Sequence, residues 1–409
     1  MSAQESIYLD WAATSLPDKQ VLEECLALSC LSYGNPSSAH GKGKEAGALL
    51  EEARMTLAQV LENQGSAESS GQGAKARGKI AFTGSGTEAD QIPLLSVLKT
   101  ALGKPAGLKD CHIVVSAIEH PAVFAQAKLL EQLGIGLSVV KPEANGRVSA
   151  EKIQKAIRPQ TRLVAVMAVN NETGAVQDIE AIGRTVREAQ RNRGSKEILF
   201  HVDFVQALGK LRISLDAALM GSAAFSAHKI GGPRGVGALW ISKNMEVLGA
   251  GGGQEGGLRS GTQNIFGALA FARCARKAAL NLDERLERAR MLESALIDGI
   301  GQIPGARVLP ECRKPGDPRY SPWILSAAFP GLSGEVLARA LSDQGIAVST
   351  GSACSQLDRK KGHRILDAMD TAQELSFSSI RISTGATTGP KDIERLLSTC
   401  ADLYRRLKT

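Results

Sequence analysis

Three side chains with different chemistry lie close together in the segment Phe225–Gly235, FSAHKIGGPRG. Ser226 supplies a hydroxyl, His228 an imidazole and Lys229 a primary amine. The glycines and proline after the lysine predict a turn, where a lysine is commonly a solvated surface charge. The other interpretation is a lysine that forms a Schiff base with a carbonyl cofactor, while the hydroxyl and the imidazole bind a phosphate. The segment alone leaves both interpretations open.

Polar residues also follow several apolar stretches that have the length of strands. Asp203 ends the stretch EILFHVD, and Gln206 follows it. A buried carboxylate is costly unless it is paired, so Asp203 is a helix cap, a salt-bridge partner or an anion that keeps a heteroaromatic nitrogen protonated. His120 follows HIVVSAIE, and Asn171 follows RLVAVMAVN. Taken alone, His120 is more often a structural histidine than a functional one.

The stretch FTGSGTEADQ, from Phe82 to Gln91, predicts a strand, a glycine-rich turn and the start of a helix. Backbone N–H groups at a helix N-terminus bind phosphate, and Gly86 and Thr87 would lie at that point. An ordinary strand–turn–helix junction explains the stretch equally well. Pro93 predicts a break or a kink in the helix that follows.

The elements that must position these residues alternate through the first two thirds of the chain. Strand-like and helix-like stretches follow each other, which predicts an α/β fold with a mostly parallel sheet covered by helices on both faces. GVGALWIS, shortly after Lys229, predicts a strand that returns beside the preceding one. Because ligands collect at the carboxyl ends of strands in such sheets, we expect the polar residues to share one site.

The pattern changes after Gly261, where a long helical stretch leads into a smaller α+β unit. A chain of 409 residues is expected to form two domains. We predict a large domain over residues 16–275 and a small domain made of residues 1–15 and 276–409. The stretch Asn63–Lys79 is rich in Gly, Ser and Ala, which is typical of a surface insertion.

The composition limits the location and the partners. No apolar run approaches the ~20 residues that span a bilayer, and no secretory signal is present, so we expect a cytoplasmic protein without a membrane partner. Aromatic residues are only 4% of the chain, so no direct nucleic-acid partner is expected despite the net charge of +7. Seven scattered cysteines without CxxC pairs argue against a disulfide framework and a zinc site.

Ten motifs occur in an order that closely resembles the NifS/IscS-type cysteine desulfurases. These motifs are YLDWAATS, GNPSSAHGKG, FTGSGTEAD, EHPAV, VNNETGAVQDI, HVDFVQALGK, SAHKIGGPRGVGALW, GGGQEGGLRSGT, STGSACS and SSIRISTG. The resemblance extends from about Tyr8 to the C-terminal helix. It implies the fold type I of the class-V aminotransferase superfamily, with a mostly parallel seven-stranded sheet, and pyridoxal 5'-phosphate as cofactor.

The resemblance also implies the residues that bind the cofactor. Lys229 would be the Schiff-base lysine and Asp203 the partner of the pyridine nitrogen. His120 would stack on the ring and shuttle protons, since an imidazole changes its charge near neutral pH. The remaining cofactor residues would be Gly86, Thr87, Ser226 and His228 at the phosphate, Asn171 and Gln206 near the phenolic oxygen, and Thr262 at the phosphate of a neighbouring subunit in a homodimer.

For the substrate L-cysteine, the resemblance implies that Arg381 binds the carboxylate, assisted by Asn35 and Asn171. Cys354 matches the cysteine that takes the sulfur as a persulfide and leaves alanine as the other product. The acceptor of that sulfur would be an iron–sulfur scaffold protein or a tRNA-thiolation protein. No resident metal is implied, apart from transient ligation of an iron–sulfur cluster by Cys354.

Three alternatives stay open: a selenocysteine lyase, another class-V enzyme such as an aminotransferase, and a non-catalytic sulfur-assembly scaffold. Cys354 argues against a plain aminotransferase, which needs no sulfur acceptor, and the complete set of site residues argues against a scaffold. The chain departs from the family pattern in the Asn63–Lys79 insertion, in QIPLL around Pro93 and in DFVQ before Gln206. None of these departures removes a catalytic group.

Overall fold

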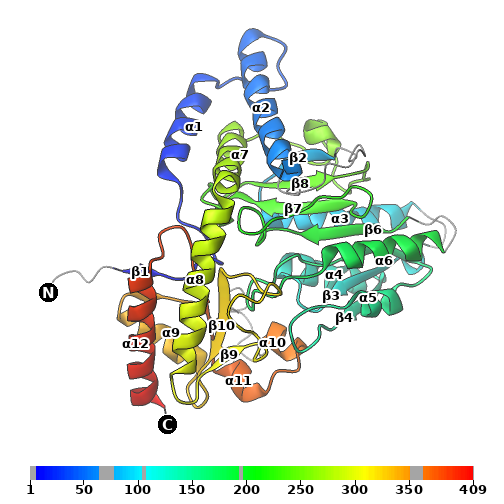
Figure 1. Cartoon of the computed structure of the whole chain (residues 1–409). Helices are drawn as coiled ribbons and strands as arrows, with labels where there is room; N and C mark the ends of the chain where they lie inside the picture. The colour runs from blue at the N-terminus through cyan, green and yellow to red at the C-terminus, as the bar shows by residue number, and fades with distance from the viewer. Residues whose placement is uncertain (1–5, 64–77, 104–106, 193–196, 351–362, 409) are drawn as a thin grey trace.

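The computed structural model describes residues 6–63, 78–103, 107–192, 197–350 and 363–408 (Figure 1). Seven strands form the main sheet in the spatial order β2–β8–β7–β6–β5–β3–β4. They are β2 (Lys79–Thr83), β3 (His112–Ser116), β4 (Gly136–Val140), β5 (Thr161–Ala165), β6 (Leu199–Asp203), β7 (Ser222–Ser226) and β8 (Gly237–Ile241). Strands β3 to β7 pair in parallel, and β8 runs antiparallel to both of its neighbours. The expected mostly parallel sheet and the return strand after Lys229 are confirmed.

Helices cover both faces of this sheet. They are α3 (Gly86–Leu102), α4 (Pro121–Gln132), α5 (Ala150–Ala156), α6 (Ile179–Arg191) and α7 (Ile265–Leu280), with the 3-10 turns η1 (Gly107–Asp110), η2 (Ala227–Lys229) and η3 (Gln254–Gly257). Because successive side chains of a strand point to opposite faces, Ile113 and Val115 pack with α3 and α4, whereas Val114 joins the cluster that contains α6 and α7. Burial on both faces explains why β3 is apolar at three consecutive positions.

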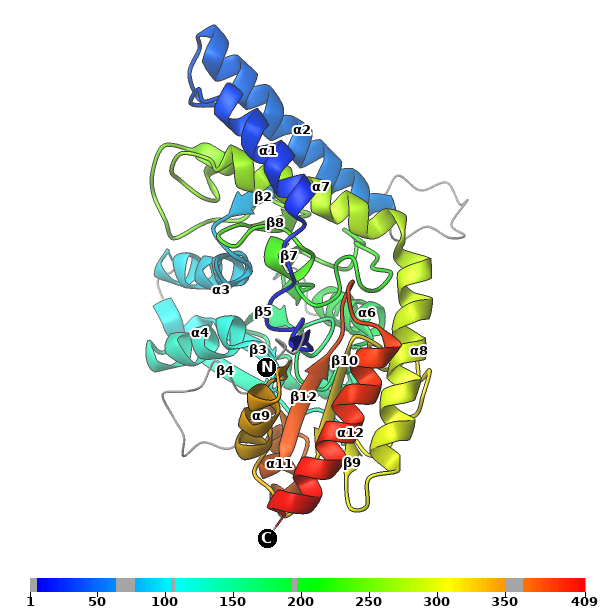
Figure 2. The ribbon, with the colours of Figure 1, turned by 90° about the vertical axis from the view of Figure 1, so that its left-hand side faces the viewer.

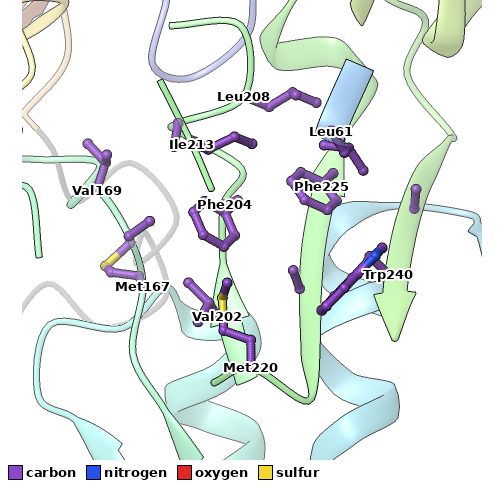
Figure 3. Close-up of a cluster of buried hydrophobic side chains, with 14 of the residues drawn as sticks. Leu61, Met167, Val169, Val202, Phe204, Leu208, Ile213, Met220, Phe225 and Trp240 are labelled. Carbon is purple, nitrogen blue, oxygen red and sulfur yellow. The ribbon is translucent and has the colours of Figure 1, made fainter. Parts of the chain in front are cut away.

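Aromatic packing supports the strand ends that lead to the polar residues. Phe204 stacks on Phe225 with ring centroids 5.8 Å apart and an interplanar angle of 14°. Both rings belong to the large buried cluster drawn in Figure 3. Phe204 follows Asp203 directly and Phe225 precedes Ser226, so this contact restrains the two positions relative to each other.

The second part of the chain, together with β1 from the N-terminal segment, forms two smaller sheets. Strands β9 (Arg307–Leu309), β10 (Ile324–Ala328) and β12 (Ser379–Ser383) pair antiparallel, and β1 (Ile7–Tyr8) pairs in parallel with β11 (Ile346–Ala347). Their helices are α8 (Leu282–Gly301), α9 (Gly334–Asp343), α10 (Arg364–Ala368), α11 (Gln373–Phe377) and α12 (Pro390–Leu407). The long helical stretch expected after Gly261 is two helices, interrupted at Asn281. The domain boundary near residue 275 stays a prediction.

Helices α1 (Lys19–Leu31) and α2 (Gly41–Asn63) pack on α7 and project from the rest of the molecule (Figure 2). Leu26, Leu31, Tyr33 and Met55 are exposed large apolar residues in this region. Within the described ranges, no helix is long and apolar enough to cross a membrane.

The expectation that Pro93 interrupts the helix after the glycine-rich turn is wrong. Helix α3 continues through Pro93 from Gly86 to Leu102. Pro93 lies on the buried face of α3 with Leu94 and Val97, so packing against the sheet offsets the lost backbone hydrogen bond. The hydroxyl of Ser96 donates to the carbonyl of Pro93 at 2.6 Å, which satisfies one polar group in this stretch.

A buried arginine connects the two parts of the chain. The Arg313 guanidinium pairs with Glu293 of α8 at 2.7 Å, and both side chains are almost completely buried. Arg313 also donates to the carbonyl oxygens of Thr173, Ser321 and Ile324 at 2.7–3.0 Å. Burial lowers the pKa of Arg313, and the Glu293 carboxylate opposes that shift.

We expect Arg313→Met to lower the free energy of unfolding by about 3–5 kcal/mol, because it leaves the Glu293 carboxylate buried without a partner. Urea unfolding of the cofactor-free protein measures this loss. The double variant Arg313→Met, Glu293→Leu removes both charges, so it should regain a large part of the stability. A double variant as unstable as the single one would show that the backbone contacts of Arg313, not the charge pair, dominate.

Candidate active site

A cavity of about 430 Å³ lies at the carboxyl ends of β5, β6 and β7. This volume is within the range of small-molecule sites, roughly 300–1,000 Å³. The predicted site residues that line it are Gly86, Thr87, His120, Asn171, Asp203, Gln206, Ser226, His228, Lys229 and Arg381. Residues 12–14 of the N-terminal segment close one side of the cavity.

Lys229 reaches the cavity from η2, directly after β7. Its Nζ donates to the carbonyl oxygens of Ala12 and Ala13 at 2.6 and 2.8 Å. The hydroxyl of Ser15 donates to the Lys229 carbonyl at 2.6 Å, so the turn and the N-terminal segment hold each other in place. The amine therefore lies at the wall of a cavity that can admit a carbonyl compound.

Asp203 is a buried acid at the end of β6. One carboxylate oxygen accepts the backbone N–H of Val205 at 2.8 Å. Burial, reinforced by the nearby Asp90 carboxylate, raises the pKa of Asp203 to about 8. An acid that holds its proton at neutral pH can share that proton with a basic ring nitrogen and then form a charged pair with it.

Three further buried titratable groups lie close to Asp203. His201 bonds through Nε2 to Asp90 at 3.1 Å and through Nδ1 to Ser222 at 2.9 Å. Burial lowers the pKa of His201 to about 4 and raises that of Glu119 to about 7. It also raises the pKa of Asp90 well above its usual range. Burial therefore favours the uncharged form of each of these groups, which limits the electrostatic cost of burying them.

His120 caps the N-terminus of α4, where its Nδ1 accepts the N–H of Ala122 at 3.2 Å. The proton of the neutral ring therefore resides on Nε2. Burial, together with the charge of Lys229, lowers the pKa of His120 to about 4. The buried ring is therefore neutral at neutral pH in the protein without cofactor, and its role as a proton shuttle stays a prediction.

The other end of the cavity is shaped to receive an anion. The 17-residue helix α3 begins at Gly86, and Ser85 caps it by accepting the N–H of Glu88 at 3.1 Å. A Cβ added at Gly86 would lie 3.0 Å from side-chain atoms of Ser226 and Val205, so glycine keeps this wall open. His228 contacts the hydroxyl of Thr14 through Nδ1 at 3.1 Å. Hydroxyls, an imidazole and a helix N-terminus together suit a phosphate.

Arg381 enters the cavity from β12 of the second part of the chain. Its guanidinium donates to Asp10 at 2.6 Å and to the carbonyl of Asn171 at 3.0 Å. The Nε of Arg381 is buried and has no hydrogen-bond partner. A guanidinium held in this way can bind a carboxylate, and Asp10 fixes its orientation.

Three predicted site residues do not line this cavity in the described structure. Asn35 lies in the exposed loop between α1 and α2, where its side chain accepts the N–H of Ser37 at 3.0 Å. Thr262 is exposed near the start of α7. Cys354 lies outside the described residues. The roles of all three stay predictions.

Several residues of the site were not predicted from the sequence. Asp10 meets Arg381 across 371 positions of the chain, and no local pattern indicates that contact. Asp90 lines the cavity from α3. An acid on the apolar face of this predicted helix could have indicated a role for Asp90 in the site. The other lining residues without a predicted role are Ala12, Ala13, Thr14, Ser85, Met167, Val205, Arg234, Gly235 and Val236.

Comparison with known proteins identifies the family. The aminotransferase class-V family model matches residues 7–396. A protein of Bradyrhizobium diazoefficiens named cysteine desulfurase is 35% identical, and the match covers 98% of this chain and 95% of the relative. The cysteine desulfurase IscS of Pectobacterium carotovorum is also 35% identical, over 98% and 93%. The chain belongs to the cysteine desulfurases of the class-V aminotransferase family.

Solved structures agree with this placement in the family. A NifS-like protein superposes with a TM-score of 0.83 at 34% identity, over 98% of this chain and all of the other. SspA, described as a complex with cysteine, gives a TM-score of 0.74 at 27% identity, over 92% and 98%. The class-V cysteine desulfurases depend on pyridoxal 5'-phosphate.

The cavity fits this cofactor on three counts. The N-terminus of α3 and the opening left by Gly86 suit the phosphate. The protonated, buried Asp203 suits the pyridine nitrogen, which needs a partner that cannot be displaced by water. Lys229 supplies the amine that a carbonyl cofactor requires. No group of three or more potential metal ligands occurs among the described residues.

Proposed function

We propose that this chain converts L-cysteine to L-alanine and holds the released sulfur as a persulfide on Cys354. Its membership of the cysteine desulfurases supports the reaction. The observation that carries the proposal is that Lys229, Asp203 and Arg381, from three separate elements, line one cavity. An amine, a buried acid and a guanidinium are the groups that a cofactor-bound amino acid needs around it.

When bound, pyridoxal 5'-phosphate supplies a carbonyl to which amines attach and a ring that accepts an electron pair from the substrate Cα. Lys229 would hold that carbonyl and, when released from it, would act as a base toward the α-proton. Asp203 would hold a proton at the ring nitrogen. His120, neutral and protonated on Nε2, presents a donor beside Lys229 rather than a second cation.

Arg381 binds the substrate carboxylate. Its Nε is the buried donor without a partner, and its contact with Asp10 keeps the plane of the guanidinium fixed. Asn171 lies next to it, since its carbonyl accepts from the same guanidinium. A related structure is described as SspA in complex with cysteine, which supports cysteine as a ligand of this chain.

The sulfur transfer balances without an external oxidant. The Cys354 thiolate attacks the sulfur of L-cysteine, the bond between that sulfur and Cβ breaks, and Cβ takes up a proton. Alanine and a Cys354 persulfide are the products. Cys354 follows Ser349 by five positions, and Ser349 exchanges two backbone hydrogen bonds with Arg381. Five residues span at most about 18 Å, so this tether permits Cys354 to approach the cavity.

We further propose a dimeric assembly and a protein acceptor for the sulfur. The protein acts as a homodimer in the cytoplasm, with Thr262 of each subunit at the phosphate site of the other. An iron–sulfur scaffold or tRNA-thiolation protein accepts the sulfur. The exposed position of Thr262, away from the cavity of its own chain, supports a role at the neighbouring site.

Alanine and sulfide released from L-cysteine in the presence of a thiol reductant test this function. We expect wild type to form both, and Cys354→Ala to bind the cofactor normally yet lose at least about 100-fold in rate. Cys312→Ala, which removes an exposed cysteine elsewhere, is the matched control and should retain the wild-type rate. Equal sulfide release by Cys354→Ala would contradict the persulfide step and leave a lyase reaction.

A further inference from the structure

We propose that Lys210 is a positioning residue that holds the Gln206 side chain with its amide nitrogen turned toward the cofactor. This inference rests on the proposed function, and it concerns a residue outside the cavity wall. Lys210 does not line the cavity that holds Lys229, Asp203 and Arg381. Its side chain bonds to Gln206, which does line the cavity.

Two neighbours determine the orientation of the Gln206 amide. The Nζ of Lys210 donates to Oε1 of Gln206 at 2.8 Å, and Nε2 of Gln206 donates to the carbonyl oxygen of Ala12 at 2.9 Å. The Ala12 carbonyl can only accept, so the opposite amide orientation would place two acceptors against each other there. It would also place two donors against each other at the ammonium form of Lys210. Nε2 carries two hydrogens, and Ala12 takes one of them. The second remains for a ligand in the cavity.

Lys210 is itself held firmly. Its side chain is about 5% exposed, and the indole of Trp323 donates to its backbone carbonyl at 2.9 Å. Burial lowers its pKa to about 7, with further contributions from the charges of Lys229, Arg285 and Arg381. A buried amine surrounded by three cations is costly, and the oxygen of Gln206 compensates part of that cost.

The same contact links Lys210 to the reactive amine. Ala12 O accepts from Gln206 Nε2 and also from Lys229 Nζ, so one carbonyl joins the two side chains. Gln206 is expected near the phenolic oxygen of the cofactor. A donor in that place, with a positive charge behind it, stabilises negative charge on the oxygen. It therefore favours the form of the loaded site that has lost a proton.

The visible absorbance of the pyridoxal-phosphate-loaded protein, titrated with pH without substrate, tests this role. We expect Lys210→Met to raise the midpoint of the titration by about one pH unit. Lys210→Arg keeps the charge and the donor, and the adjoining cavity of about 300 Å³ that Lys210 lines leaves space for it, so the midpoint should return toward wild type. Arg285→Met is the matched control, because Arg285 is a half-buried cation on the same cavity whose hydrogen bonds, among the contacts described, go only to backbone carbonyls.

The double variant Lys210→Met, Gln206→Leu decides whether Lys210 acts through Gln206. If it does, the double variant should have the midpoint of Gln206→Leu alone, because nothing remains for Lys210 to position. An unchanged midpoint in Lys210→Met, shifts that simply add in the double variant, or an equal shift in Arg285→Met would each overturn the inference. A wild-type protein without a visible band after loading would instead overturn the proposed function.

Discussion

Lys229→Ala is expected to lower alanine formation from L-cysteine by at least about 1,000-fold. The substitution removes the amine that holds the cofactor carbonyl and takes the α-proton. No other primary amine is among the described residues that line the cavity. His120 is neutral and, with Nδ1 already accepting from a backbone N–H, presents a donor instead of a base. Measuring the rate and the visible spectrum together separates loss of cofactor attachment from loss of the proton transfer.

Adding a small primary amine to Lys229→Ala tests directly whether the missing amine causes the loss of rate. The space left by the lysine side chain lies at the cavity wall, next to the carbonyl oxygens of Ala12 and Ala13 that accepted its hydrogens. Ethylamine should therefore restore part of the rate in a concentration-dependent way. Lys277→Ala removes a surface lysine paired with Asp18 and serves as control. A Lys229→Ala protein that turns over at the wild-type rate would refute the assignment of the reactive amine.

Asp203→Asn is expected to lower the turnover of the loaded enzyme and to raise the stability of the cofactor-free protein. With cofactor bound, the amide cannot hold a charge at the ring nitrogen, so turnover should fall by at least about 100-fold. Without cofactor, the same substitution should stabilise the protein at alkaline pH. The reason is that burial raises the pKa of Asp203 from 3.8 to about 8, so the folded state keeps a proton that the unfolded chain releases.

The direction in which the free energy of unfolding changes with pH follows from that difference in proton binding. Between pH 3.8 and about 8 the unfolded chain binds fewer protons at this position, so the free energy of unfolding falls as pH rises, by up to about 1.4 kcal/mol per pH unit. Buried His120 and His201 have lowered pKa values and act in the opposite direction, but only below about pH 6.5. Above about pH 7 the lowered pKa of buried Lys210 also acts in the opposite direction. The difference in stability between wild type and Asp203→Asn at pH 6.5–8 therefore isolates Asp203, because Lys210, Glu119 and Asp90 are common to both proteins.

Urea unfolding of the cofactor-free proteins across this window measures the effect. Asp203→Asn should show a shallower decline than wild type and a higher stability at pH 8. Asp178→Asn is the matched control, because Asp178 caps α6 at an exposed position and asparagine caps a helix equally well. Parallel stability curves for wild type and Asp203→Asn would show that Asp203 ionises in the folded protein as it does in the unfolded chain.

The sequence alone predicted the α/β architecture and most of the candidate cavity. Strands of a parallel sheet read as short apolar runs, and their carboxyl ends lie at one edge, so polar residues at such ends could be grouped before any contact was known. His120, Asp203 and Lys229 were found in this way. The motif order then indicated the chemistry, since several segments with separate roles rarely occur together in sequence without a common site.

Only the tertiary structure decided how those residues are supported and charged. Asp10 orients Arg381 and Lys210 orients Gln206 through contacts that depend on packing between distant or buried segments. Pro93 lies inside a continuous helix because burial of one helix face outweighs local propensity. The neutral state of His120 has the same origin. A side chain's type sets its usual pKa, but its burial and its neighbours, which no local pattern encodes, set the charge it carries in the site.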